Sequence, residues 1–157
     1  MSADYQIKQI TQNDLGLMGA LSETFGEVFD EMDTYTGNRP ALDYLWQLLG
    51  SDNFIALVAL KEEQVVAGLA AYELKKFEQQ RSEIYIYDLA VSALHRQQGI
   101  ATALIHYLGE LAAKRGAYVI FVQADTGPED EAAIALYSKL GSKENVLHFD
   151  IPVRRLS

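Results

Sequence analysis

The sequence contains no cysteine, and its 157 residues include only three histidines, three prolines and one tryptophan. Without cysteine there is no disulfide framework, no thiolate zinc site and no cysteine nucleophile. The histidines are widely scattered and form no ligand pair at helical spacing, so we expect no metal site. The chain also lacks internal repeats and Pro/Ser-rich linkers, which indicates a single domain over residues 1–157.

Long apolar runs are also absent. No run has the length of a bilayer-spanning helix, and the N-terminus has no basic-then-apolar signal region, so we expect a cytoplasmic protein without a membrane partner. Basic residues are few: 13 Lys and Arg face 22 Asp and Glu, a net charge of −9 that argues against nucleic acid. Residues 1–60 alone hold nine acids and two bases. This excess fits either a solvated surface or a site that attracts cations.

Hydrophobic residues make up 49% of the chain, which is enough for one sizeable core. Apolar alternation and short apolar runs predict six strands, at residues 5–10, 54–60, 65–74, 83–91, 118–123 and 146–153. Helical spacing and end signals predict four helices, at residues 13–29, 40–49, 99–116 and 128–140. The order implies antiparallel strands early and a β-α-β crossover late, so we expect a mixed α/β domain of the α+β type.

The most informative stretch runs from Asp88 to Thr102, where a predicted strand ends and a predicted helix begins near Gly99. It lacks both the Gly-x-Gly-x-x-Gly of dinucleotide-binding folds and the Gly-Lys-Ser/Thr of a P-loop. Arg96-x-x-Gly99-x-Ala101 instead puts small residues and a guanidinium at a helix start, where N–H groups and the helix dipole favour an anion. By itself the pattern also suits an ordinary strand-loop-helix connection with a glycine turn.

In its context, the pattern resembles the pyrophosphate loop of the GCN5-related N-acetyltransferase (GNAT) superfamily. The apolar run Leu89-Ala90-Val91 precedes it, and Leu136-Tyr137 followed by Gly141 resembles a second family signature. The segments 83–91, 95–105, 116–125 and 146–151 are most similar to type I aminoglycoside 3-N-acetyltransferases. Those enzymes use acetyl-CoA to acetylate the 3-amino group of the 2-deoxystreptamine ring in drugs such as gentamicin.

This resemblance implies a central mixed sheet of six to seven strands flanked by about four helices, with acetyl-CoA as cofactor. The implied cofactor-binding residues are Leu89, Ala90, Val91, Arg96, Gln97, Gln98, Gly99, Ile100, Ala101 and Thr102. Asp130 stands where many members have an Asn that binds pantetheine. A carboxylate accepts hydrogen bonds but donates none, so a CoA contact and a helix N-cap are both open for Asp130.

The resemblance also implies catalytic roles for Asp88 and Tyr137. Since no cysteine can carry the acetyl group, we expect direct attack of the amine on the thioester. Asp88 would take the amine proton, directly or through water; the alternative is a carboxylate that caps a strand bulge. Tyr137 is the family's usual acid near the CoA sulfur; the alternative is a tyrosine packed on the core.

The implied acceptor is a polycationic small molecule, most simply an aminoglycoside. Acids would hold its ammonium groups by charge-assisted hydrogen bonds, or each acid would be merely solvated or a cap. The candidates are Asp30, Glu31 and Asp33 in the predicted loop after the first helix, Asp125 at a strand end, and Asp150 in the last predicted strand. Other possible functions are a polyamine or peptide N-acetyltransferase and a non-catalytic CoA-binding module. Such proteins often dimerise, so we expect a homodimer.

Overall fold

The computed structural model describes residues 4–155, and the contacts within the chain divide it into two compact units, Met1–Gln123 and Ala124–Ser157. The strands of the first unit are β1 (Gln6–Gln9), β2 (Phe54–Lys61), β3 (Gln64–Lys75), β4 (Ser82–Val91) and β5 (Ala117–Val122). Its helices are α1 (Leu15–Phe29), α2 (Met32–Thr36), α3 (Leu42–Leu49) and α4 (Ile100–Arg115). The second unit contains α5 (Glu131–Leu140). Within residues 4–155 no helix is long and apolar enough to span a bilayer.

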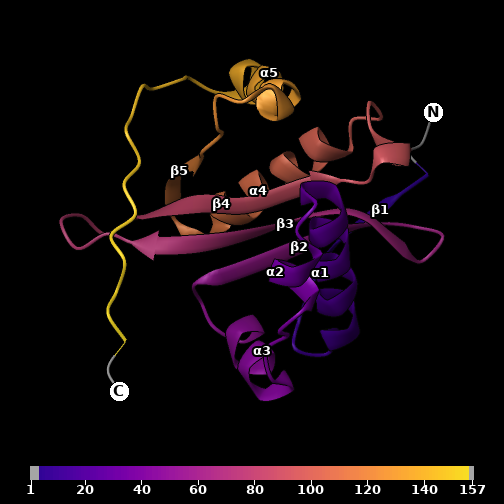
Figure 1. The fold of residues 1–157 in the computed structure, drawn as a ribbon. Coiled ribbons are helices and arrows are strands. Elements are labelled where there is room, and N and C mark those ends of the chain that lie inside the picture. Colours follow the sequence, from indigo (N-terminus) through magenta and orange to yellow (C-terminus); the bar gives the residue numbers. More distant parts are fainter. Residues whose placement is uncertain (1–3, 156–157) are drawn as a thin grey trace. The chain divides into compact units, whose positions relative to one another are not determined.

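The five strands form one mixed sheet in the order β1-β2-β3-β4-β5. The first three pairings are antiparallel, and β4 pairs with β5 in parallel. Parallel neighbours need a crossover connection, and α4 provides it (Figure 1). The predicted mixed α/β fold, with early antiparallel strands and a late crossover, is therefore confirmed.

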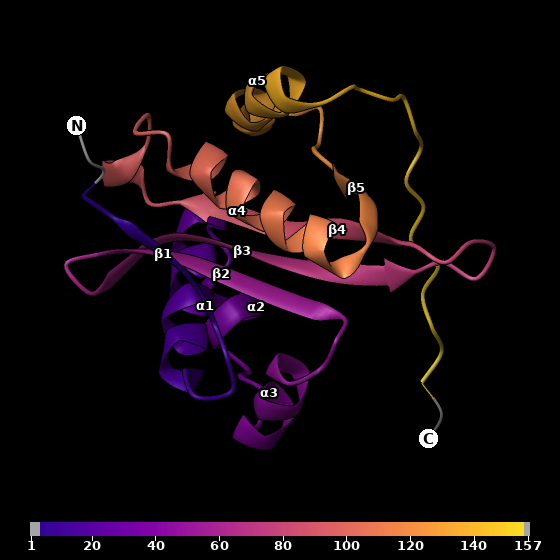
Figure 2. The same cartoon turned by 180° about the vertical axis from the view of Figure 1, so that it is seen from behind.

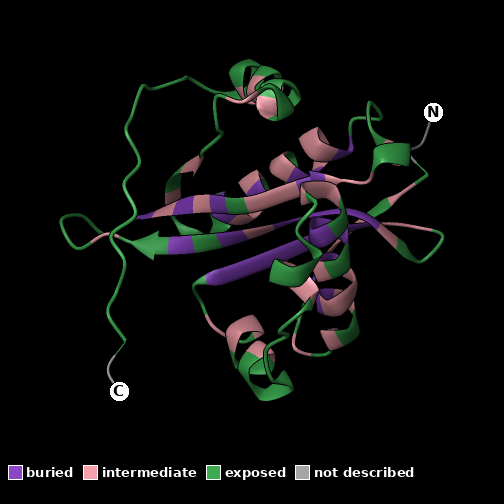
Figure 3. Ribbon diagram, viewed as in Figure 1, coloured by how far each residue is buried: buried purple, intermediate pink, exposed green. Residues whose placement is uncertain are grey.

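Two hydrophobic clusters lie on opposite faces of this sheet, and β2 contributes alternate residues to each. Ile55, Leu57 and Ala59 join the cluster that includes Leu104 and Leu108 of α4. Phe54, Ala56 and Val58 join the cluster that includes Leu21 and Phe25 of α1. In Figures 1 and 2, α4 accordingly covers one face of the sheet and α1, α2 and α3 lie on the other. Figure 3 shows the central strands as the most buried part of the chain.

A glycine in β3 lets α1 approach the sheet closely. A Cβ at Gly68 would lie 2.6 Å from the carbonyl oxygen of Leu57 and would also collide with Leu21. Leu21 is almost fully buried at this point. Because Gly68 has no side chain, Leu21 of α1 can pack directly against the sheet at this point. This contact sets how closely α1 approaches the sheet, and α2 follows α1 on the same face.

The structure corrects two element predictions. Residues 142–155 form no strand, so the described sheet has five strands rather than six to seven. Their side chains alternate as in a strand, but a strand also needs a neighbouring edge to bond with its backbone. Residues 30–39, predicted as a loop, contain the short helix α2. The absence of a Cβ at Gly26 leaves room for Met32 against α1, a contact that no local pattern reveals.

Candidate active site

Asp88 lies in β4 and is partly buried. It pairs with Ala70 of β3, next to an irregularity where the register of β3 and β4 shifts. The hydroxyl of Tyr35 on α2 donates a hydrogen bond to its Oδ1 atom at 3.0 Å. A single short helix thus holds the carboxylate that the sequence singled out as the base.

Burial raises the pKa of the Asp88 carboxyl above its usual value, because water that would solvate the charge is excluded. The hydrogen bond from Tyr35 favours the charged form and opposes this rise, whereas the charge of Glu31 adds to it. A carboxylate with a raised pKa is a better proton acceptor than an exposed one. These surroundings suit a general base.

Tyr35 is positioned by aromatic packing. Its ring centroid lies 5.7 Å from that of Phe25 and 5.8 Å from that of Phe29, both on α1. Burial is the main reason that the pKa of its phenol is strongly raised, with Asp88 next, so it stays a protonated donor. Tyr35 could not be predicted from the sequence, because Tyr35 and Asp88 are 53 positions apart and no spacing connects them.

The predicted acceptor acids of the first unit surround α2. Asp30 is the C-cap of α1 in left-handed conformation, Glu31 is the N-cap of α2, and Asp33 lies in the first turn of α2. All three are exposed. Glu31 is close enough to Asp88 to influence its pKa, which brings at least one of these acids to the proposed base.

Strand β4 extends beyond the end of β5. The last pair in their register is Ile86 with Val122, although β4 continues to Val91 in pairing with β3. The backbone of residues 87–91 on the side toward β5 therefore has no β5 partner. This stretch of β4 contains Leu89-Ala90-Val91, where the resemblance puts the pantetheine arm, and backbone groups that lack a strand partner can bind an extended amide chain.

The loop before α4 fits a pyrophosphate. Gly99 is the N-cap of α4 with φ of 78°, and a Cβ there would meet nothing within 4 Å, so the space beside the helix start is open. The first N–H groups of a helix have no intrahelical partner and attract anions. Arg96 donates from Nε to the carbonyl of Val91 at 3.2 Å, which leaves its terminal nitrogens for a phosphate. The side chain of Ile100 is core, so only its backbone is available to a cofactor.

The remaining candidates belong to the second unit. Asp130 accepts a hydrogen bond from the backbone N–H of Asp125 at 2.7 Å, so its carboxylate orders the turn before α5 and makes no side-chain cap bond. Burial, and next the charge of Asp130, raise the pKa of Tyr137 on α5, which keeps the phenol protonated. Asp150 contacts Nε2 of His148 at 2.8 Å. Both residues lie in the exposed segment that forms no strand, so the predicted strand setting of Asp150 is wrong.

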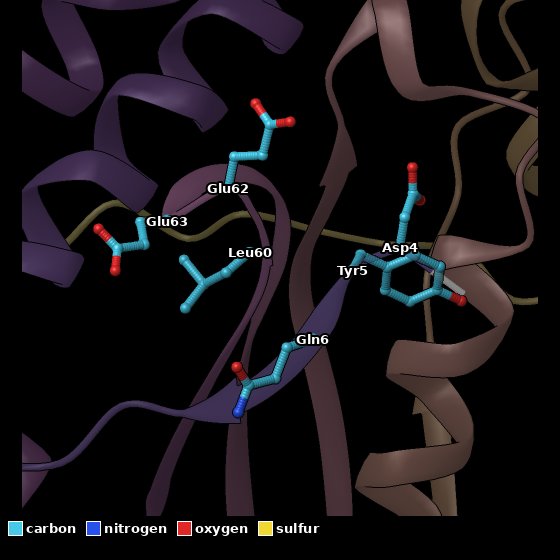
Figure 4. Close-up of a pocket in the computed structure, with 6 residues that line it drawn as sticks. All are labelled: Asp4, Tyr5, Gln6, Leu60, Glu62 and Glu63. Carbon is cyan, nitrogen blue, oxygen red and sulfur yellow. The ribbon is translucent and has the colours of Figure 1, made fainter. Parts of the chain in front are cut away.

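Two surface hollows of the described residues lie elsewhere. One of about 260 Å³, shown in Figure 4, is lined by Asp4, Tyr5, Gln6, Leu60, Glu62 and Glu63. Another, of about 600 Å³, lies between α1 and α3 and includes Ala20 and Leu45. Neither contains a predicted site residue. The candidate site therefore rests on the Asp88 carboxylate, the part of β4 beyond the end of β5, and the start of α4.

Comparison with known proteins fits this arrangement. The model of the acetyltransferase (GNAT) family matches residues 20–142, so the chain belongs to the GNAT acetyltransferases, a family that uses acetyl-CoA. Among curated proteins, N-acetyltransferase 8B of Rattus norvegicus is 31% identical over 99 residues, which cover 63% of this chain and 44% of that protein. The human N-acetyltransferase 8 is 32% identical over 87 residues, which cover 55% of this chain and 37% of that protein. The matches thus span less than half the length of these curated relatives.

Two solved structures resemble this chain over nearly its full length. An aminoglycoside acetyltransferase from an uncultured soil metagenomic sample is 66% identical, with a TM-score of 0.95, over 98% of this chain and 100% of that one. A second one from such a sample, solved with sisomicin, is 31% identical with a TM-score of 0.87, over 96% and 97% of the two chains. The fold is therefore the mixed α/β GNAT fold.

Proposed function

We propose that the chain transfers an acetyl group from acetyl-CoA to the 3-amino group of a 2-deoxystreptamine aminoglycoside. The observation that carries the proposal is the partly buried Asp88, held by Tyr35 in the part of β4 that extends beyond the end of β5. Its support comes from the 66% identity with an aminoglycoside acetyltransferase and from the sisomicin complex of the second relative. The choice of the 3-amino group rests on the sequence resemblance to the type I enzymes.

Each of the candidate residues has a separate role in the proposed acetyl transfer. Acetyl-CoA supplies the acetyl group as an activated thioester. The helix start at residues 99–102 and Arg96 hold the pyrophosphate, and the backbone of residues 87–91 holds the pantetheine arm. The Asp88 carboxylate takes the amine proton, since only a neutral amine has a lone pair for attack. The Tyr137 phenol, kept protonated, holds a proton for the sulfur that departs.

Two other functions would use the same fold and must be distinguished from the proposed one by experiment. A polyamine or peptide N-acetyltransferase would use the same donor with a different amine, and a CoA-binding module would show no turnover. A thiol-release assay with acetyl-CoA against gentamicin, spermidine and a basic peptide distinguishes the three. We expect turnover with gentamicin alone, with the product acetylated at the 3-amino nitrogen by NMR. We further expect a cytoplasmic homodimer, which gel filtration and fractionation test.

The role of Asp88 is tested by Asp88→Asn, which keeps the shape and an acceptor for Tyr35 but removes the base. We expect kcat to fall roughly 100-fold, with the loss shrinking as pH rises because more amine is already neutral. Acetyl-CoA affinity, measured by calorimetry, should stay the same. Asp43→Asn, at an exposed carboxylate of α3, is the control and should have parental kinetics. A change in the amine KM alone would make Asp88 a substrate ligand instead of the base.

The cofactor loop is tested at Gly99 with two variants. Both Gly99→Ala and Gly99→Trp carry the strain of a side chain at positive φ, but only the indole fills the open space beside the helix start. We expect Gly99→Trp to abolish CoA binding measured by calorimetry and Gly99→Ala to retain most of it. Equal binding by the two folded variants would remove residues 96–102 from the cofactor site.

A further inference from the structure

Five aromatic rings form a continuous row across four strands of the sheet. The row comprises Phe54 of β2, Tyr72 of β3, Tyr87 and Tyr85 of β4, and Phe121 of β5. Successive ring centroids lie 5.3, 6.0, 5.7 and 4.7 Å apart. We call these five residues the tyrosine row.

The rings at the two ends of the tyrosine row are packed against other side chains, and two rings in the middle are exposed to solvent. Phe54 is buried with 5% exposure, and Tyr85 stacks on Phe121 with an interplanar angle of 4°. The Tyr85 hydroxyl also donates a hydrogen bond to Oε1 of Gln123 at 3.0 Å. Tyr72 and Tyr87 are 36% and 62% exposed. Adjacent exposed rings on a rigid sheet are costly to leave in water and typically mark a binding surface.

The two exposed rings lie beside Asp88, since Tyr87 directly precedes it in β4 and Tyr72 lies two residues after Ala70, the β3 partner of Asp88. Burial is the largest cause that raises the pKa of the Tyr72 phenol, and the nearby Tyr44, Asp88 and Tyr87 add to it. Burial, then Tyr87 and Asp88, act in the same way on the pKa of Tyr85. The proposed base and the tyrosine row therefore share one site, with Glu31 on the adjoining α2.

Exposed tyrosine rings beside the carboxylates of Asp88 and Glu31 match one class of ligand. The face of an aromatic ring is negative and attracts cations, and carboxylates beside it strengthen the attraction. The C–H groups of a saturated amino-substituted ring can pack flat on such a face, while its ammonium groups reach the acids. A neutral sugar would use the ring faces alone, whereas a linear polyamine or a basic peptide would bring cations to the carboxylates without a saturated aminated ring to pack flat on the tyrosines.

We propose that the tyrosine row is the platform on which the acceptor aminoglycoside stacks, with Tyr87 and Tyr72 against an aminated ring and the reacting amine directed to Asp88. This inference rests on the proposed function and adds the residues that select the acceptor. It accounts for two exposed tyrosines that neither the core nor the acetyl-transfer steps require.

The test compares three variants in the full chain. Tyr87→Leu keeps apolar volume but removes the ring face, and Tyr87→Phe keeps the face but removes the hydroxyl. Phe77→Leu, at the fully exposed ring of the β3–β4 hairpin, is the matched control. For Tyr87→Leu we expect the gentamicin KM to rise roughly 5- to 30-fold, as for loss of a cation–π contact. Tyr87→Phe and Phe77→Leu should stay within about twofold of the parent, and the acetyl-CoA KM and thermal melting should hold in all three.

Calorimetric titration with gentamicin and with sucrose, a neutral disaccharide, separates this proposal from the proposed function. Parental turnover with an unchanged gentamicin KM in Tyr87→Leu overturns the platform and leaves the function standing. If the parent binds gentamicin without acetylating it, the proposed function is wrong, and a weaker Kd in Tyr87→Leu still supports the platform.

Two binding results overturn the platform itself. These are the absence of gentamicin binding and sucrose binding of equal strength. If the parent acetylates another amine instead, an unchanged KM for that amine in Tyr87→Leu overturns it too.

Discussion

Asp88 is held between groups that act on its pKa in opposite directions. Burial raises the pKa and Glu31 adds to the rise, whereas the hydrogen bond from Tyr35 lowers it. Tyr72 and Tyr85 also lie within its electrostatic reach. Because a base works only when ionised, the balance of these groups sets the pH at which the proposed reaction begins.

We predict that Tyr35→Phe moves the acid limb of the kcat/KM profile to higher pH. The variant keeps the ring that packs on Phe25 and Phe29 but loses the donor that stabilises the carboxylate, so the pKa of Asp88 rises. Activity is then lost on the acid side and recovers toward the parental plateau as pH increases. Glu31→Gln removes a repelling charge and should move the same limb to lower pH. Equal losses at every pH would indicate a purely structural role for Tyr35.

Asp88→Asn should also increase stability at neutral pH. A carboxyl whose folded pKa is raised binds its proton more tightly in the native state, so its ionisation disfavours folding. This cost appears as pH rises past the unfolded pKa, about 3.9, and is complete above the folded pKa. The neutral amide avoids it and still accepts from Tyr35. Thermal melts at pH 4 and pH 8 should show a gain for Asp88→Asn that is larger at pH 8. A loss at pH 8 would mean that the charge itself supports the fold.

The sequence singles out Asp88 as a candidate but gives no sign of Tyr35, which donates a hydrogen bond to it. Asp88 could be predicted because it precedes the Leu89-Ala90-Val91 run in a local motif. Tyr35 and the middle of the tyrosine row could not, because their partners come from other strands and helices. Contacts of this kind depend on the sheet register and on how deeply α1 packs, which Gly68 fixes in three dimensions.

Among the elements, those with an apolar face of several turns or with a buried strand pattern could be predicted. The sequence patterns predict the four longer helices and the five strands at nearly their observed positions. Helix α2 could not be predicted, because its five residues are too few to show helical periodicity and its packing comes from α1. Residues 146–153 carry a clear alternation, but whether such a segment forms a strand depends on an available sheet edge.

The turn between β2 and β3 contains strain that can be removed. Glu62 and Glu63 have φ of 51° and 67°, a left-handed region that costs residues with a Cβ about 1–2 kcal/mol each. Asn and Gly are the residues favoured in such a two-residue hairpin turn. We predict that Glu62→Asn with Glu63→Gly raises the free energy of unfolding by about 1–2 kcal/mol and Tm by roughly 2–8 °C. Glu78→Asn, in a loop position without positive φ, should give no gain in the same calorimetric scan.

Across the chain, acidity is concentrated in the part that contributes α1 and α2. Residues 1–60 hold nine of the 22 acids and only two of the 13 bases. The structure places Asp30, Glu31 and Asp33 at and beside α2, the helix that reaches Asp88. A field of one sign near the proposed base would attract a polycation over distances longer than any single hydrogen bond.

This arrangement predicts a specific dependence on salt. The screening length falls from about 10 Å at 0.1 M to about 3 Å at 1 M, so contacts between exposed charges weaken steeply. The KM for gentamicin should therefore rise with ionic strength. The KM for acetyl-CoA should change less, because the backbone N–H groups of the α4 start supply much of its binding. Steady-state kinetics from 0.05 to 1 M salt, with both substrates varied, measures the two slopes.

Single charge removals then decide which acids act on the substrate. Glu31→Gln should raise the gentamicin KM and flatten its salt slope, because one of the screened charges is gone. Asp150→Asn should do the same only if the C-terminal segment contributes to the acceptor site. A charge-assisted hydrogen bond corresponds to about 1.5–3 kcal/mol, or roughly 10- to 150-fold in KM. If the gentamicin KM does not respond to salt and both variants match the parent, the acids only solvate the surface. Any preference for a polycation would then rest on the attraction of cations to the ring faces of the tyrosine row alone.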